Sequence, residues 1–165
     1  MPASRSKPTL EQRIRELLRS SGLRCTPVRM AVLQHLSRRG RPLSHGEISG
    51  AGIVADLDRV TLYRTLVALQ DAGLVQRAQD ERGAWRYCAH VRLAKGCPGN
   101  HAHFQCTRCG RMDCLAQQAL PWVDVPAGAL IAGKQFLVYG LCSPCASTAA
   151  PDRHAEREAV TPGKH

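Results

Sequence analysis

Apolar residues recur three or four positions apart through the first part of the chain, which is the spacing of one face of an α-helix. Residues 9–21 carry a leucine and isoleucine stripe that opens with a capping box formed by Thr9 and Gln12. A second helix is expected at Thr26 and Pro27, because a capping residue there precedes a proline at the first helical position. The pattern therefore predicts two amphipathic helices at the start of the chain.

Two more helices are expected before residue 73. Ser44 and Glu47 form a second capping box, which predicts a short third helix weakened by its glycines. Asp58 is placed to cap a fourth helix over residues 59–72, with leucines at helical spacing on its inner face.

The periodicity then changes from helical spacing to short apolar runs. Residues 74–77 and 85–88 read as two strands around a turn at residues 80–83. Helices followed by a hairpin are the pattern of a winged helix-turn-helix, in which the helix before the wing enters the major groove of DNA. We therefore predict an α+β protein whose winged-helix DNA-binding domain occupies residues 1–88.

The remainder of the chain predicts a second, smaller α/β domain. A polar, glycine-bearing stretch makes residues 89–102 a hinge, and the small domain is expected over residues 103–147. Short strand-like runs cover residues 104–106, 111–115 and 134–141. Between them, residues 116–133 start with a helical pattern that prolines then break. Residues 148–165 are polar and charged and are expected to be a disordered tail.

Four cysteines form two C-x-x-C pairs, Cys106 with Cys109 and Cys142 with Cys145. This spacing lets four thiolates share one tetrahedral Zn²⁺. The alternative is a redox C-x-x-C, but that motif occurs singly in a βαβ context, which this sequence lacks. We therefore expect a structural zinc site with four cysteine ligands.

Charge and composition narrow the class of partner. The formal net charge of the 165-residue chain is +10, and 15 Lys/Arg against 8 Asp/Glu give residues 1–88 a balance of +7. This suits a polyanion, although a solvated arginine-rich surface is the alternative. The 4% aromatic content disfavours a base-stacking platform. No apolar run has the length of a membrane span, and no secretory signal follows Met1, so a cytoplasmic protein without a membrane or small-molecule partner is expected.

These motifs together resemble the ferric uptake regulator family, and within it the zinc uptake regulators. The similarity is carried by segments at residues 22–29, 60–66, 71–75, 101–110 and 140–145, each of which matches a family motif. The resemblance implies a homodimeric bacterial repressor whose small domain dimerises and whose metal-loaded form binds an operator. It also implies a second, regulatory zinc, which would make two Zn²⁺ per chain.

The resemblance assigns four candidate ligands to the regulatory site, which are Cys88, His101, His103 and Cys114. Two thiolates with imidazoles suit Zn²⁺ better than Fe²⁺ or Mn²⁺. The alternative for each of the two cysteines is a small buried hydrophobe. We expect the two histidines to face opposite ways on an extended stretch, so that only one, His103, reaches Cys88. His90 and Cys97 are spare candidates. Gln76 stands where zinc sensors often have a further ligand.

Another metal site of the family is not expected here. Its matching positions carry residues without a suitable donor set, which are Asn100, Ala102, Pro121 and Lys134. Four other potential donors are not expected to bind metal, which are Cys25, His45, His154 and His165.

The resemblance also assigns DNA contacts. Tyr63 and Arg64 match recognition-helix positions, and Arg24 matches a basic minor-groove position. A bidentate arginine–guanine pair is worth about 1–3 kcal/mol of discrimination. Arg59 and Thr61 are expected to contact phosphates. Core packing is the alternative for Tyr63.

Three other functions stay open at this point. A family regulator that responds to another metal or to peroxide is one. A winged-helix protein with structural zinc only, in which Cys88 and Cys114 act as redox switches, is another. A zinc enzyme is the third, because His45 and Glu47 match the H-x-E of zinc deaminases. The proline of the partner motif is misplaced, however, and Glu47 is better explained as half of a capping box.

Overall fold

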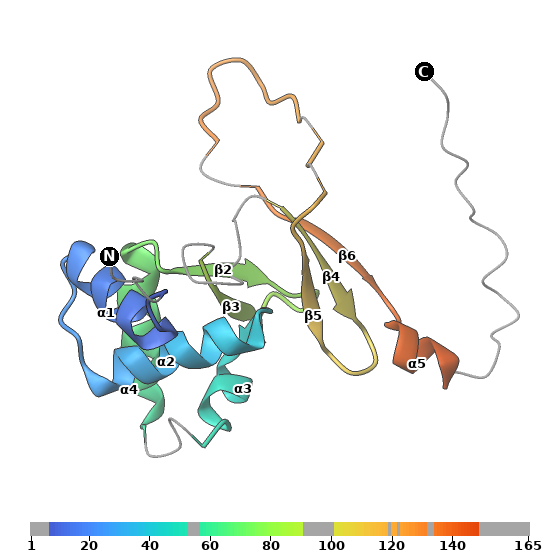
Figure 1. Cartoon of the computed structure of the whole chain (residues 1–165). Coiled ribbons are helices and arrows are strands. Elements are labelled where there is room, and N and C mark those ends of the chain that lie inside the picture. Colours follow the sequence, from blue (N-terminus) through green and yellow to red (C-terminus); the bar gives the residue numbers. More distant parts are fainter. Residues whose placement is uncertain are drawn as a thin grey trace, which may run out of the picture.

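The computed structural model describes residues 7–52, 57–90, 101–118, 120–121, 123–131 and 134–148. Its elements form two groups along the chain (Figure 1). The first group contains α1 (Leu10–Ser20), α2 (Pro27–Arg39), β1 (Leu43–Ser44), α3 (His45–Ser49), α4 (Arg59–Asp71), β2 (Val75–Gln79) and β3 (Trp85–Ala89). The second contains β4 (Ala102–Cys106), β5 (Met112–Leu115), β6 (Phe136–Gly140) and α5 (Ser143–Ser147). The arrangement confirms the predicted α+β class.

The helices begin where the sequence predicted. The Thr9 hydroxyl accepts a hydrogen bond from the Gln12 N–H at 3.2 Å, and the Gln12 side chain accepts one from the Thr9 N–H at 2.8 Å. The second capping box, at the start of α3, is also complete. The Asp58 carboxylate accepts from the first N–H groups of α4, at 2.9 Å each. These caps satisfy backbone donors that a helix leaves unpaired at its N-terminus.

The wing is a three-stranded antiparallel sheet with the strand order β1-β3-β2. Arg77 of β2 pairs with Tyr87 of β3, as expected for the predicted hairpin, while β1 was not predicted. The Asp80 carboxylate accepts from the N–H groups of Arg82 and Ala84 at 3.0 and 2.9 Å, which fixes the turn between the two long strands. The hairpin therefore ends in an ordered, hydrogen-bonded tip.

One hydrophobic core joins the helices to this sheet. The predicted inner face of α4 is fully buried at Leu62, Leu66 and Leu69. These leucines belong to a cluster whose buried members all lie between Ile14 and Ala89. Helix α4 and the wing consequently share one packed unit.

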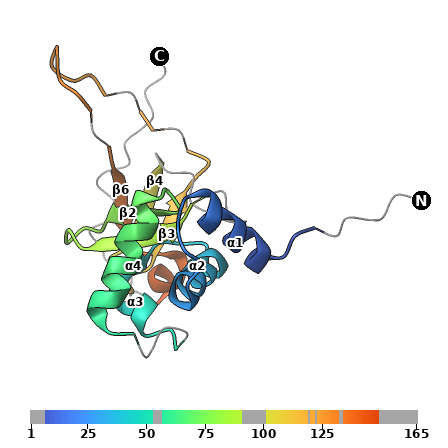
Figure 2. The ribbon, with the colours of Figure 1, turned by 90° about the vertical axis from the view of Figure 1, so that its left-hand side faces the viewer.

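The second sheet has the strand order β5-β4-β6, with β4 antiparallel to β5 and parallel to β6. The predicted helical start of residues 116–133 is wrong for the described positions. Residues 116–118 form a turn, and no described residue between β5 and β6 is helical. Pro121 and Pro126 interrupt this stretch, and Gly128 has a φ of 82°. Figures 1 and 2 both show this connection extending away from the two sheets.

Two parts of the predicted organisation lie mostly outside the described residues. Of the predicted hinge, only Ala89, His90, His101 and Ala102 are described. Ala89 ends β3 and Ala102 begins β4, so the strands extend slightly into it. Of the predicted tail, only Thr148 is described, and it follows the short helix α5, which was not predicted.

Candidate metal centres and nucleic-acid surface

The two C-x-x-C pairs meet at one end of the second sheet. Cys106 ends β4, Cys109 follows in the next turn, Cys142 precedes α5, and Cys145 lies within it. All four Sγ atoms lie within 4.8 Å of one another. The Cys142 N–H also donates to the Cys106 Sγ at 3.3 Å. Backbone N–H donation of this kind is typical of a thiolate, so the arrangement suits an ion held by four sulfurs.

The four thiols differ in acidity. The Cys109 and Cys142 N–H groups lower the pKa of the Cys106 thiol to about 6. The hydrogen bond between Cys145 and the Cys142 sulfur raises the pKa of Cys145 to about 12. Neighbouring thiols are difficult to deprotonate together, because their negative charges repel, unless a cation compensates that charge. The donor set therefore fits a soft divalent metal such as Zn²⁺, which binds the thiolate form.

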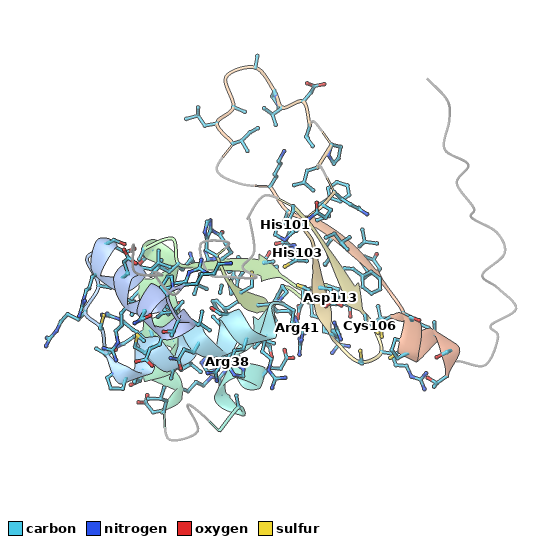
Figure 3. All side chains as sticks on the ribbon, in the orientation of Figure 1. Arg38, Arg41, His101, His103, Cys106 and Asp113 are labelled. Carbon is cyan, nitrogen blue, oxygen red and sulfur yellow. The ribbon has the colours of Figure 1, made fainter. Side chains whose placement is uncertain are left out.

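A second cluster of donors lies at the start of β4, at the opposite end of the strand from Cys106. The ligand atoms of His101, His103 and Cys114 all lie within 4.8 Å of one another. Figure 3 shows His101 and His103 close together on the second sheet. Cys114 joins the histidines because it pairs with His103 in the antiparallel β4–β5 register. The two imidazole rings lie 4.5 Å apart between centroids. The expectation that they face opposite ways was wrong, because residues two positions apart on an extended strand share a face.

His103 supplies the clearest sign of a missing partner at this cluster. The residue is only 8% exposed, and both of its ring nitrogens are buried without a hydrogen-bond partner. Buried polar atoms are almost always satisfied, so such an imidazole is an unusual structural residue. Two imidazoles and one thiol form a soft set that fits Zn²⁺ with one further ligand.

The fourth expected ligand is not part of this three-residue cluster. Cys88 is buried on β3, and its Sγ lies 3.9 Å from the Gln76 carbonyl oxygen. His90 is half-buried, and its N–H donates to the Leu74 carbonyl. Cys97 lies outside the described residues. The structure thus brings three of the four predicted regulatory ligands together.

Reasoning from the sequence missed a network of ion pairs that joins the wing to α3. The Arg86 guanidinium contacts the Asp80 carboxylate at 3.1 Å and the Glu47 carboxylate at 3.2 Å. Glu47 also pairs with Arg41 at 2.9 Å. Hydrogen bonds from Ser44 and Arg41 keep the pKa of Glu47 below its usual value although burial opposes them. Glu47 is therefore held as a paired carboxylate at the start of α3, in keeping with its place in the capping box.

The predicted DNA contacts lie at the surface of the winged-helix unit. Arg24, Arg59 and Arg64 are exposed, and Tyr63 is 55% exposed, so core packing does not explain the tyrosine. The Thr61 hydroxyl donates to the Asp58 carboxylate at 2.5 Å, and this bond holds the pKa of Asp58 low. Thr61 thus belongs to the helix cap and would have to release this bond to donate to a phosphate.

A groove of about 510 Å³ separates the start of α4 from the wing. Its walls include Val60, Tyr63, Trp85 and Tyr87. The Arg77 guanidinium lies over the Trp85 ring, 4.0 Å from its centroid. The groove thus places apolar side chains beside Arg59 at the start of α4.

Comparison with known proteins places the chain in a family. The profile of the Ferric uptake regulator family matches residues 20–121. The chain is 33% identical over 138 residues to the transcriptional regulator FurA of Mycobacterium bovis, covering 79% of this chain and 88% of that protein. It is 30% identical over 135 residues to a ferric uptake regulation protein of Legionella pneumophila, covering 78% and 95%.

Solved structures share the fold at lower identity. A zinc uptake regulator complexed with zinc and DNA gives a TM-score of 0.59 at 21% identity, covering 86% of this chain and 97% of that one. The Helicobacter pylori ferric uptake regulator gives 0.58 at 20% identity, covering 87% and 97%. Among the described helices, none is long and apolar enough to cross a bilayer. With its winged helix and thiol-rich second sheet, this chain belongs to the ferric uptake regulator family of metal-responsive transcriptional regulators, which are not enzymes.

Proposed function

We propose that this protein is a zinc-dependent repressor that binds operator DNA as a homodimer and carries two Zn²⁺ per chain. The observation that carries this proposal is the pair of separate soft-donor clusters on one small sheet. Zinc at the four-cysteine cluster would stabilise the sheet. The His101, His103 and Cys114 cluster would be the regulatory site that senses the metal. Bound zinc would supply a divalent charge and a tetrahedral geometry that hold these side chains together.

The donor set supports zinc over the other metals of the family. Fe²⁺ and Mn²⁺ favour sites richer in oxygen ligands, whereas the cluster offers two imidazoles and a thiol. Cys88 is the proposed fourth ligand. It is buried on β3, and its strand ends just before the segment that leads to His101. A ligand from the wing would connect metal binding to the position of the DNA-binding unit.

The surface of α4 supports operator binding. Arg64 is proposed to read a guanine edge and Tyr63 to contact bases in the major groove. Arg24 is proposed to enter the minor groove, while Arg59 contacts phosphates. Thr61 is proposed as a weaker phosphate contact because its hydroxyl already donates to Asp58.

Exposed apolar residues support a homodimer formed through the second sheet. Phe136, Val138 and Tyr139 of β6 are 43%, 46% and 65% exposed, and β6 lies at the edge of its sheet. Apolar side chains on an unpaired edge strand are a common site of self-association.

The proposed sensing role is tested by Cys88→Ser, with Cys25→Ser, just before α2, as the matched control. DNA is selected from a random pool by the zinc-loaded wild type, and its affinity is then measured with and without added zinc. The proposal expects Cys88→Ser to lose the zinc response while keeping the zinc of the four-cysteine cluster and the dimer, and Cys25→Ser to respond like the wild type. A full zinc response in Cys88→Ser would remove Cys88 from the site.

A second measurement counts the zinc ions. The wild type is expected to hold two per chain, and the double variant His103→Ala with Cys114→Ser to hold one. One zinc in the wild type would instead favour the function with structural zinc only.

A further inference from the structure

The tip of the wing is hydrogen-bonded directly to the second sheet. The Glu81 N–H in the wing turn donates to the Gln105 side-chain oxygen at 2.8 Å. The Gln79 N–H donates to the Gln135 side-chain oxygen at 2.8 Å, and the Gln135 amide donates back to the Gln79 carbonyl at 2.7 Å. Gln135 therefore pairs with the end of β2 as a neighbouring strand would.

These contacts join parts of the fold that are distant in sequence. Residues 24 and 56 positions apart are linked, and the bonds run from the winged-helix unit to Gln105 on β4 and to Gln135 just before β6. A polar cavity of about 280 Å³ lies beside them, with walls from the wing turn and from residues 105–110. The Asp80 carboxylate also holds the turn internally, because it accepts from the Arg82 and Ala84 N–H groups.

Gln105 shares its strand face with the proposed sensing cluster. Gln105 lies two residues after His103 on β4, so both side chains point to one side of the sheet. Met112, which pairs with Gln105, is fully buried, and Gln105 itself is only 3% exposed. A shift of β4 on metal binding would therefore move the Gln105 contact together with the histidines.

We propose that Gln105 and Gln135 form a latch that transmits occupancy of the His101, His103 and Cys114 cluster to the wing, and through it to the recognition helix. Both glutamines act as positioning residues. The latch holds the wing in the orientation that the metal-loaded protein presents to DNA. This inference rests on the proposed zinc-dependent DNA binding and adds the path by which the metal acts.

The first test uses the full chain with Gln105→Leu and Gln135→Leu combined, and Gln117→Leu as the control. Gln117 is an exposed glutamine on the connection after β5. The latch predicts that the double variant keeps two zincs and its dimer. Its zinc-induced gain in operator affinity should be about tenfold smaller than that of the wild type, as the loss of a few net hydrogen bonds allows. Binding to random DNA should not change. A double variant that responds to zinc like Gln117→Leu would overturn the latch.

A second test needs no substitution and covers the case in which the double variant does not fold. Amide hydrogen exchange is measured on the wild type with the four-cysteine site loaded, before and after zinc fills the second site. The latch predicts slower exchange at the Gln79 and Glu81 N–H groups, and unchanged exchange at those two amides contradicts it.

The two hypotheses fail in different ways. A wild type whose operator affinity ignores zinc refutes the proposed function. A zinc-dependent wild type with no change at the Gln79 and Glu81 amides refutes the latch alone.

Discussion

The two halves of this molecule are stabilised by different means. The winged-helix half packs its leucines, isoleucines and valines into one continuous core between Ile14 and Ala89. Past residue 100, the buried apolar residues among the described positions are Ala102, Cys106 and Met112 alone. Large apolar side chains are instead exposed there, with Leu130 97% and Tyr139 65% exposed.

The difference indicates what each half requires in order to fold stably. A half with a closed core can fold on hydrophobic burial, which is worth about 25 cal/mol per Å² of apolar surface. A small sheet without such a core needs a metal, a disulfide or a partner subunit. The metal clusters and the exposed β6 strand occur in the half that lacks the core.

The largest expected effect is that zinc removal unfolds only the second half. Structural zinc contributes on the order of 10 kcal/mol to small metal-stapled domains. Cys106→Ser, or a strong chelator acting on the full chain, should abolish amide protection in β4 and β6. Residues of α4 should stay protected, as followed by hydrogen exchange with mass spectrometry. Simultaneous loss of protection in both halves would mean that the two are one cooperative unit.

Truncating a core leucine should instead destabilise the first half of the molecule. Leu66→Ala removes a fully buried side chain and is expected to lower the free energy of unfolding by about 2–5 kcal/mol. Val138→Ala on the exposed β6 strand is the matched control, and it should weaken the dimer more than it weakens the fold. Chemical denaturation and sedimentation measure the two effects, and a loss of less than about 1 kcal/mol for Leu66→Ala would contradict the assigned core.

Direct contacts with DNA bases should likewise come from the first half alone. Arg64→Ala is expected to weaken operator binding by about 1–3 kcal/mol, with less effect on random DNA. Arg111→Ala, which removes an exposed arginine from the second half, is the control and should leave specificity unchanged. Fluorescence anisotropy at fixed salt measures both affinities. Equal losses on the two DNAs would reduce Arg64 to a phosphate contact.

The smallest expected effect is a pH dependence confined to the first half. Burial, with the nearby Arg39, Arg38 and Arg41, lowers the pKa of His35 from its ordinary value of 6.5. Below about pH 6.5 the unfolded chain then binds more protons than the folded one, so stability falls with falling pH until the folded-state pKa is passed. His35→Leu should flatten this part of the profile in urea titrations. An identical slope in the variant would assign the effect to other groups.

The sequence predicted local features well because they depend on neighbouring residues. The capping boxes, the Asp58 cap and the inner face of α4 each follow from residues within one or two helical turns. The α+β class and the winged helix followed from their order. The family assignment rested on motifs that the comparisons support independently.

The features that were missed depend on distant contacts. The latch glutamines have no local signature, because their amide partners lie 24 and 56 residues away. The expected helix after β5 was wrong because its early periodicity did not outweigh Pro121 and the residues beyond it. The placement of His101 and His103 on opposite faces was an error in applying strand alternation, and the true two-residue period places them together.

The central claim is that zinc at the His101, His103 and Cys114 cluster controls DNA binding. The direct measurement is operator affinity against free zinc concentration, with the four-cysteine site already loaded, for the wild type and for His103→Ala. The account predicts a gain of about 5–150-fold in the wild type, the usual range of allosteric coupling, and none in the variant. Equal zinc-dependent gains in both proteins, or no gain in the wild type, would contradict it.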